Sequence, residues 1–232
     1  MRHLLAAAVL TALCAGCTRA PDLPPAEIEA LAMTAAQRGS ADAERQLRAL
    51  ADAGNTVARR ELGILYRQRP ALRPEAMELL RRAALAGDAQ AAYHLGELYR
   101  GAQADNPSGA AAAWPWYRRA ADGGHARAAL VLGQMAKNGD GMPRDMMAAA
   151  HWLQRASDLG NAHAMFLLSY LYRDGDGVPR DPARARTLLE EAAEHEYPPA
   201  LQELALTVED PQRAGHLMKE AVEHRRNNWN RF

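Results

Sequence analysis

The sequence NGDGMPRD at Asn138–Asp145 recurs as DGDGVPRD at Asp174–Asp181, 36 residues further along the chain. A period of this length is typical of helical solenoids, in which each unit is a pair of helices and neighbouring units share one core. The glycines supply the positive φ angles of a tight loop, and Asp145 and Asp181 are suited to cap the helix that follows. The repeat therefore predicts an all-α fold.

The same pattern extends to four units over residues 55–196. Four glycines end the segments that precede successive units: Gly54, Gly87, Gly124 and Gly160. An apolar residue followed by a small one recurs inside each unit, at Leu62-Gly63, Leu95-Gly96, Leu132-Gly133 and Leu168-Ser169. These pairs lie on one helical face, where the small residue lets a second helix approach closely. Each unit is therefore predicted to be a helix, a loop and a helix.

The flanking segments carry weaker versions of the pattern. We predict a capping helix pair over residues 26–54, and a degenerate repeat, cap and tail over residues 197–232, because terminal repeats must expose a polar outer face. The second unit has an insertion at residues 103–108 and carries Trp114 beside Pro115, which can kink a helix. Trp114 is either a binding anchor or a packing residue that covers the kink. Asn227–Phe232 either closes the last helix pair or extends as a recognition tail.

The first residues have the features of a targeting signal. Arg2 and His3 precede ten apolar residues, Leu4–Leu13, and small residues lead to Cys17. Ten helical residues reach about half of a bilayer's hydrocarbon thickness, so residues 1–16 are predicted to be a removable signal peptide. Leu13–Cys17 resembles the lipobox of bacterial lipoproteins, although Cys14 stands where leucine is usual. The alternative is an ordinary secretory signal cut near Cys17.

The lipoprotein resemblance implies where the chain is held. It implies cleavage before Cys17 and lipidation of its thiol, followed by a proline-rich tether over residues 17–25. Both of the protein's cysteines lie in this N-terminal segment, so the remainder has no possible internal disulfide. Thr18 replaces the aspartate that retains lipoproteins at the inner membrane. The expected location is therefore the periplasmic face of the outer membrane, with the lipid as anchor.

The fourth unit carries the pattern of a known repeat. It has Ala164, Leu168-Ser169, Tyr172, the loop Gly175–Val178, Asp181 and Ala192-Ala193, with Glu196 in place of a closing glycine. This pattern resembles the SEL-one-like repeat (SLR) family, which is related to tetratricopeptide repeats. The resemblance implies a right-handed α-solenoid of stacked helix-turn-helix repeats whose first helices line the concave side.

A basic residue would then recur in the concave groove. The residue that follows the aromatic position of the first helix is Arg67, Arg100, Lys137 and Arg173 in the four units. Three aromatic residues, Tyr93, Phe166 and Tyr170, lie at neighbouring helical offsets. We predict that these seven residues bind a protein partner, because arginine binds carboxylates well and aromatic side chains are common anchors. The alternative is a solvated basic face with no partner.

Other activities are not favoured by the sequence. The 28 basic and 28 acidic residues give a net charge of zero, which argues against gross nucleic-acid affinity. The Asp174–Asp176 loop does not match a calcium loop, since Ala185 stands where the twelfth-position acid belongs. Histidines are scattered, and no nucleophile or phosphate-binding motif is present. We therefore predict no metal, no cofactor and no enzymatic activity.

The sequence leaves three functions open. The first is a lipid-anchored periplasmic scaffold or adaptor that binds envelope proteins, as the resemblance to SLR lipoproteins implies. The second is an immunity protein that neutralises a periplasmic toxin, which SLR lipoproteins also do. The third is a β-lactam-binding or β-lactam-hydrolysing enzyme, which the missing cysteine pairs disfavour.

Overall fold

The computed structural model describes residues 23–101 and 107–227, and over those residues it is all-α, without strands. Its helices pack as consecutive pairs. They are α1 Pro25–Arg38, α2 Ala41–Asp52, α3 Thr56–Tyr66, α4 Arg73–Leu85, α5 Ala89–Gly101, α6 Pro107–Asp122, α7 Ala126–Asn138, α8 Met146–Asp158, α9 Ala162–Asp174, α10 Pro182–Glu194, α11 Pro198–Thr207 and α12 Pro211–Asn227, with a 3-10 turn at Pro70–Leu72 before α4. The predicted all-α solenoid is confirmed.

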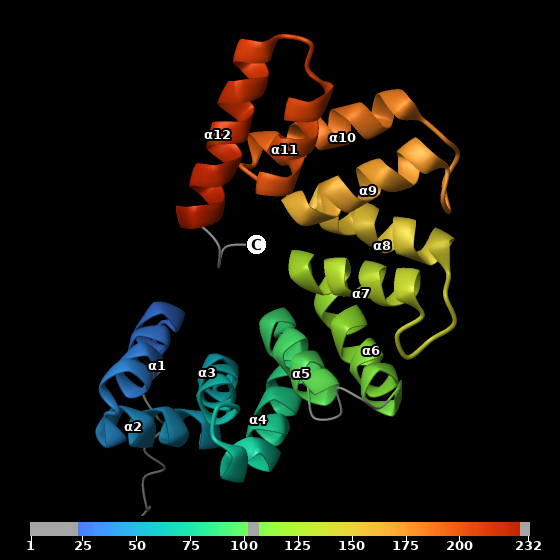
Figure 1. The fold of residues 1–232 in the computed structure, drawn as a ribbon. Coiled ribbons are helices and arrows are strands. Elements are labelled where there is room, and N and C mark those ends of the chain that lie inside the picture. The colour runs from blue at the N-terminus through green and yellow to red at the C-terminus, as the bar shows by residue number, and fades with distance from the viewer. Residues whose placement is uncertain (1–22, 102–106, 228–232) are drawn as a thin grey trace, which may run out of the picture.

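The pairs follow one another around an open arc, with α1 and α12 at its two ends (Figure 1). Helices α3, α5 and α7 lie on the inner side of this arc, and α4 and α6 lie outside them. None of the helices in the described ranges combines the length and apolarity needed to cross a bilayer.

In the four repeat units, each first helix begins at a side-chain cap. The Oδ1 atoms of Asn55 and Asn161 accept hydrogen bonds of 2.9 Å from backbone N–H groups three residues later. His125 does the same through Nδ1, at 3.2 Å. Asp145 and Asp181 cap the second helices α8 and α10, as the sequence predicts. These caps satisfy backbone donors that the helix itself leaves free.

The small residue of each first helix sets the distance to its second helix. A Cβ placed on Gly133 would lie 2.7 Å from the Cγ atom of Leu153, and one on Gly96 would lie 2.8 Å from the Tyr117 ring. Both distances are shorter than ordinary carbon contacts. Glycine is therefore required at these positions, and the core of the solenoid runs along the seam between the two helices of each unit.

Two arginines join successive second helices. Arg119 Nε donates a 2.7 Å hydrogen bond to the Ala84 carbonyl, and Arg155 Nε donates one of 3.1 Å to the Ala121 carbonyl. Both acceptors lie in the last turn of the preceding second helix, where each carbonyl also accepts a hydrogen bond of 3.0 Å from the N–H group of the glycine that follows the helix. Arg119 and Arg155 lie at equivalent positions of their units, but nothing in the sequence alone indicates this role.

Trp114 is a packing residue. It is half-buried, and its ring meets Trp152 edge to face with 6.2 Å between the ring centres. Pro115 lies inside α6, which continues to Asp122. Most of the insertion at residues 103–108 falls outside the described residues, as do Cys17 and the tail from residue 228 onward.

Candidate protein-binding surface

The first helices keep a partly open face after each has packed against its second helix. We call the faces of α3, α5, α7 and α9 that carry the seven predicted residues and Arg127 the inner face. Side chains on this face make contacts between neighbouring first helices. Arg67 of α3's C-terminal end contacts His94 of α5, and Tyr170 of α9 contacts Glu203 of α11. The structure therefore brings the predicted residues onto one continuous row of helices.

The four basic residues of this row differ in their charge partners. Arg173 pairs with Asp174 at 2.8 Å and with Glu203 at 3.5 Å. Arg100 makes only a long ion pair, 3.7 Å from Asp140. Arg67 and Lys137 have no carboxylate partner among the residues that the structure describes. The basic row predicted from the sequence is thus neutralised at Arg173 and weakly paired at Arg100. Within the described residues it has no carboxylate partner at Arg67 and Lys137.

Arg67 contacts a histidine ring instead of a carboxylate. Its Nη1 atom lies 2.9 Å from Nδ1 of His94, and its Nε atom is buried without a hydrogen-bond partner in the described structure. Because a guanidinium only donates, Nδ1 must accept, and His94 is neutral with its proton on Nε2. Burial, together with the smaller effect of the positive charge of Arg67, lowers the pKa of His94 from 6.5 to about 4.

The aromatic residues make cross-helix contacts. Tyr93 stacks on His125 with 4.4 Å between ring centres, and burial raises the pKa of Tyr93. Phe166 meets Tyr170 edge to face at 5.0 Å. The guanidinium of Arg173 lies 4.2 Å from the centre of the Tyr170 ring. All three predicted aromatics are half-buried, so each offers part of a ring to a partner and uses the rest for packing.

Sequence reasoning missed two of the acids that limit the basic row. Asp140 lies in the glycine loop after α7, and Glu203 lies on α11, outside the four units. Neither is close in sequence to the arginine that it pairs with, so no local signal identified them. Arg127 is a further exposed basic residue, close to Tyr93 and without a carboxylate partner in the described ranges.

The described residues form no candidate metal site. No group of three or more His, Cys, Asp or Glu side chains in those ranges is placed to hold an ion. Asp174 instead forms an ion pair with Arg173, whose hydrogen bonds lower the pKa of the Asp174 carboxyl.

These features define an α-solenoid of helix-loop-helix repeats that presents charged and aromatic side chains along its first helices. The chain belongs to the Sel1 repeat family, whose model matches residues 57–88, 89–125, 126–161 and 162–197. Sel1 repeats mediate protein–protein interaction, and the family consists generally of non-catalytic scaffolds.

Solved structures share the fold. A Sel1 repeat protein from Oxalobacter formigenes is 24% identical, with 85% of each chain covered and a TM-score of 0.67. The immunity protein Pa5087 from Pseudomonas aeruginosa is 19% identical over 88% of this chain and 82% of that chain, with a TM-score of 0.50. At these identities the similarity concerns the fold alone. No curated protein matches the chain significantly.

Proposed function

We propose that this protein is a lipid-anchored periplasmic scaffold that binds an acidic segment of an envelope protein on the part of its inner face formed by α3, α5 and α7. The observation that carries the proposal is the set of basic groups there without a carboxylate partner among the described residues: Arg67, Arg127 and Lys137. Arg100 lies between them in the chain and has only the long contact to Asp140.

Carboxylates of a partner would form ion pairs with these basic side chains. Arginine forms paired hydrogen bonds with a carboxylate, and such charge-assisted bonds are stronger than neutral ones. The half-buried ring of Tyr93 lies beside Arg127 and offers an apolar contact within the same surface. Charge complementarity of this kind favours specificity and fast association.

The anchor is supported by the sequence of the first residues. The basic start, the ten apolar residues and the run to Cys17 fit a lipoprotein signal. After the predicted cleavage removes Cys14, Cys17 would have no other cysteine to pair with, and lipidation would use its thiol. The absence of aspartate at position 18 supports the outer membrane as the location.

Reversing the charge on the inner face is expected to weaken binding of the partner at least about tenfold. The variant is Arg100→Glu combined with Lys137→Glu, and the measurement is crosslinking and capture from membranes of cells that make the full chain. Both side chains are partly exposed, so the free energy of unfolding should change by less than about 1 kcal/mol.

The matched control is Arg184→Glu combined with Arg213→Glu. These two arginines are exposed near the starts of α10 and α12, where an acidic residue is compatible with the helix dipole. The control should capture the same partner as the unaltered protein. Equal capture by all three folded, correctly localised proteins would show that the inner face is not the binding surface.

The anchor makes a separate prediction. Cells fed an alkyne-labelled palmitate should label the protein, and Cys17→Ser should abolish the label and release the protein from the membrane fraction. Ser is close in size to Cys but cannot be lipidated through a thiol. Cys14→Ser is the control and should keep the label. A membrane-bound, unlabelled native protein would contradict the proposed anchor.

An immunity protein is the second candidate. The fold shared with the immunity protein Pa5087 supports it, because that protein uses the same class of scaffold. Its partner would be a toxin rather than a resident envelope protein. The identity of the captured protein, and protection of cells against it, chooses between the two functions.

A further inference from the structure

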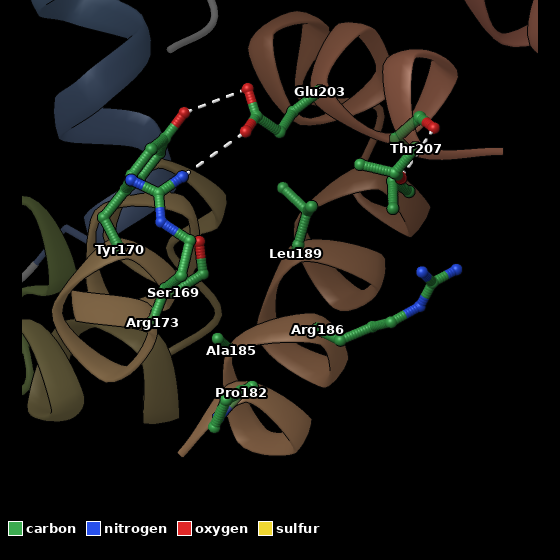
Figure 2. Close-up of a pocket in the computed structure, with 10 residues that line it drawn as sticks. Ser169, Tyr170, Arg173, Pro182, Ala185, Arg186, Leu189, Glu203 and Thr207 are labelled. Atoms are coloured by element: carbon green, nitrogen blue, oxygen red, sulfur yellow. Dashed lines mark hydrogen bonds and ion pairs between the residues drawn. The ribbon is translucent and has the colours of Figure 1, made fainter. Parts of the chain in front are cut away.

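A cavity of about 160 Å³ lies where α9, α10 and α11 meet (Figure 2). Its walls and rim are formed by Ser169, Tyr170, Arg173, Pro182, Ala185, Arg186, Leu189, Glu203, Leu204 and Thr207. Two of these residues, Ser169 and Thr207, depart from the repeat pattern of the earlier units.

The first departure is Ser169. The other three units have glycine at this position, and at Gly133 that glycine lets Leu153 pack against the first helix with only 1% of its surface exposed. Ser169 has a side chain where Gly133 has none. Leu189, the counterpart of Leu153, is only half-buried and lines the cavity instead.

The second departure is Thr207, the last residue of α11. The equivalent positions of α5, α7 and α9 hold Leu98, Met135 and Leu171, which are no more than 7% exposed. Threonine is shorter than these residues and leaves the wall of the cavity incomplete. A hollow therefore remains where the fifth helix pair, α11 and α12, packs against the fourth unit. Between earlier units, larger side chains fill the corresponding space.

The lining of the hollow is apolar in effect. Ser169 Oγ donates a 2.7 Å hydrogen bond to the Phe166 carbonyl, and Thr207 Oγ1 donates one of 2.9 Å to the Leu204 carbonyl. Neither hydroxyl has a proton left for a ligand. Pro182, Ala185 and Leu189 supply carbon surface. A cavity of about 150 Å³ with such walls is large enough for a benzene ring, so a leucine or methionine side chain fits this one.

The rim carries charge. Figure 2 shows Tyr170 and Arg173 reaching toward Glu203, whereas Arg186 lies on the opposite side and points away from them. The Tyr170 hydroxyl donates to Glu203 at 3.1 Å, and Arg173 lies 3.5 Å from the same carboxylate. Arg186 pairs with Glu190 on the exposed surface of α10. Exposed pairs contribute little to stability, so both guanidiniums can exchange their partners for a ligand's carboxylates.

We propose that this cavity takes a leucine or methionine side chain that is flanked by acidic residues in the partner protein. The proposal rests on the proposed function, because Tyr170 and Arg173 belong both to the inner face and to the rim of the cavity. The apolar side chain fills the hollow between Ser169 and Thr207, and the flanking carboxylates meet Arg173 and Arg186.

The test uses two synthetic peptides, acetyl-Glu-Leu-Glu-amide and acetyl-Glu-Ala-Glu-amide, with methyl-labelled full chain observed by NMR. The leucine peptide should shift the methyl signals of Leu189 and Leu204. The alanine peptide should bind at least about tenfold more weakly, because it buries fewer carbon atoms. Equal binding of both peptides, or shifts confined to other methyl groups, would overturn the proposal.

Restoring the repeat pattern supplies the decisive variant. Ser169→Gly combined with Thr207→Leu should close the cavity and abolish binding of the leucine peptide, while the melting temperature stays equal or rises. Thr207→Leu alone is a second variant that fills the same space without a glycine in the helix. Leucine-peptide binding that survives in either folded variant would place the site elsewhere.

The two proposals can fail separately. Arg100→Glu combined with Lys137→Glu leaves every residue of the cavity in place and should still bind the leucine peptide. Peptide binding at the cavity together with partner capture that ignores these two substitutions would overturn the inner-face proposal alone. Partner capture that depends on them, without peptide binding at the cavity, would overturn the cavity proposal alone.

Discussion

Gly177→Ala is expected to lower the free energy of unfolding by at least about 3 kcal/mol, the sum of backbone strain and steric overlap. Gly177 has a φ of +71° in the loop between α9 and α10. A Cβ there would also overlap the Met146 carbonyl at the start of α8. Because that neighbour is backbone, it cannot move aside as a flexible side chain does. Urea unfolding followed by circular dichroism measures the loss.

Gly160→Ala separates the two causes. Gly160 has a φ of +80°, but a Cβ there meets no atom within 4 Å. It should therefore cost only the strain of the left-handed conformation, about 1 kcal/mol. Equal losses for both variants would mean that the Gly177 loop does not pack against α8 as the structure places it.

Acid is expected to destabilise the α3–α5 contact through His94. The pKa of His94 is lowered from 6.5 to about 4 in the folded protein, first by burial and then by the nearby charges of Arg67, His125 and Arg60. Between these two values the unfolded chain binds more protons than the folded one. The stabilising effect is therefore complete above the unfolded pKa and is lost as the pH falls toward the folded one. The loss should be about 3 kcal/mol between about pH 7 and pH 4.

His94→Gln is the control for this pH dependence. Glutamine can still accept a hydrogen bond from Arg67, but it does not titrate. The variant should lose less stability on acidification than the unaltered protein when urea unfolding is measured across the same pH range. Half-buried His125 and His163, whose pKa values burial also lowers, remain in both proteins, so most of their contribution cancels in the difference. Parallel pH curves for the two proteins would contradict a neutral, buried His94.

Much of the fold is predictable from the sequence because its signals are local and repeated. Gly139 and Gly175 follow the ends of α7 and α9 with positive φ, and Asp145 and Asp181 cap the next helices. A helix end or a cap depends on residues three or four positions apart, so a single unit contains the whole signal. Four copies of the signal then define the solenoid.

The candidate site is only partly predictable. The basic residues of the inner face recur at one position per unit and are visible in the sequence. Their partners are not, because the Arg67 to His94 contact spans 27 residues and Glu203 lies beyond the fourth unit. The cavity was not predictable either. It depends on Ser169, which replaces a glycine of the repeat, and on Thr207, which replaces a larger apolar residue. Each change is small, and the two residues lie on separate helices.

The sequence by itself determined the helix pairs and their period, and it predicts an N-terminal signal and a recurring basic residue on the first helices. Each of these follows from short-range spacing, caps and hydrophobic pattern. Only the tertiary structure decided which charges are neutralised, that His94 is buried against Arg67, and that a hollow remains between α9, α10 and α11. These depend on how neighbouring units meet, and the energy of a charge or a cavity is set by the atoms packed around it.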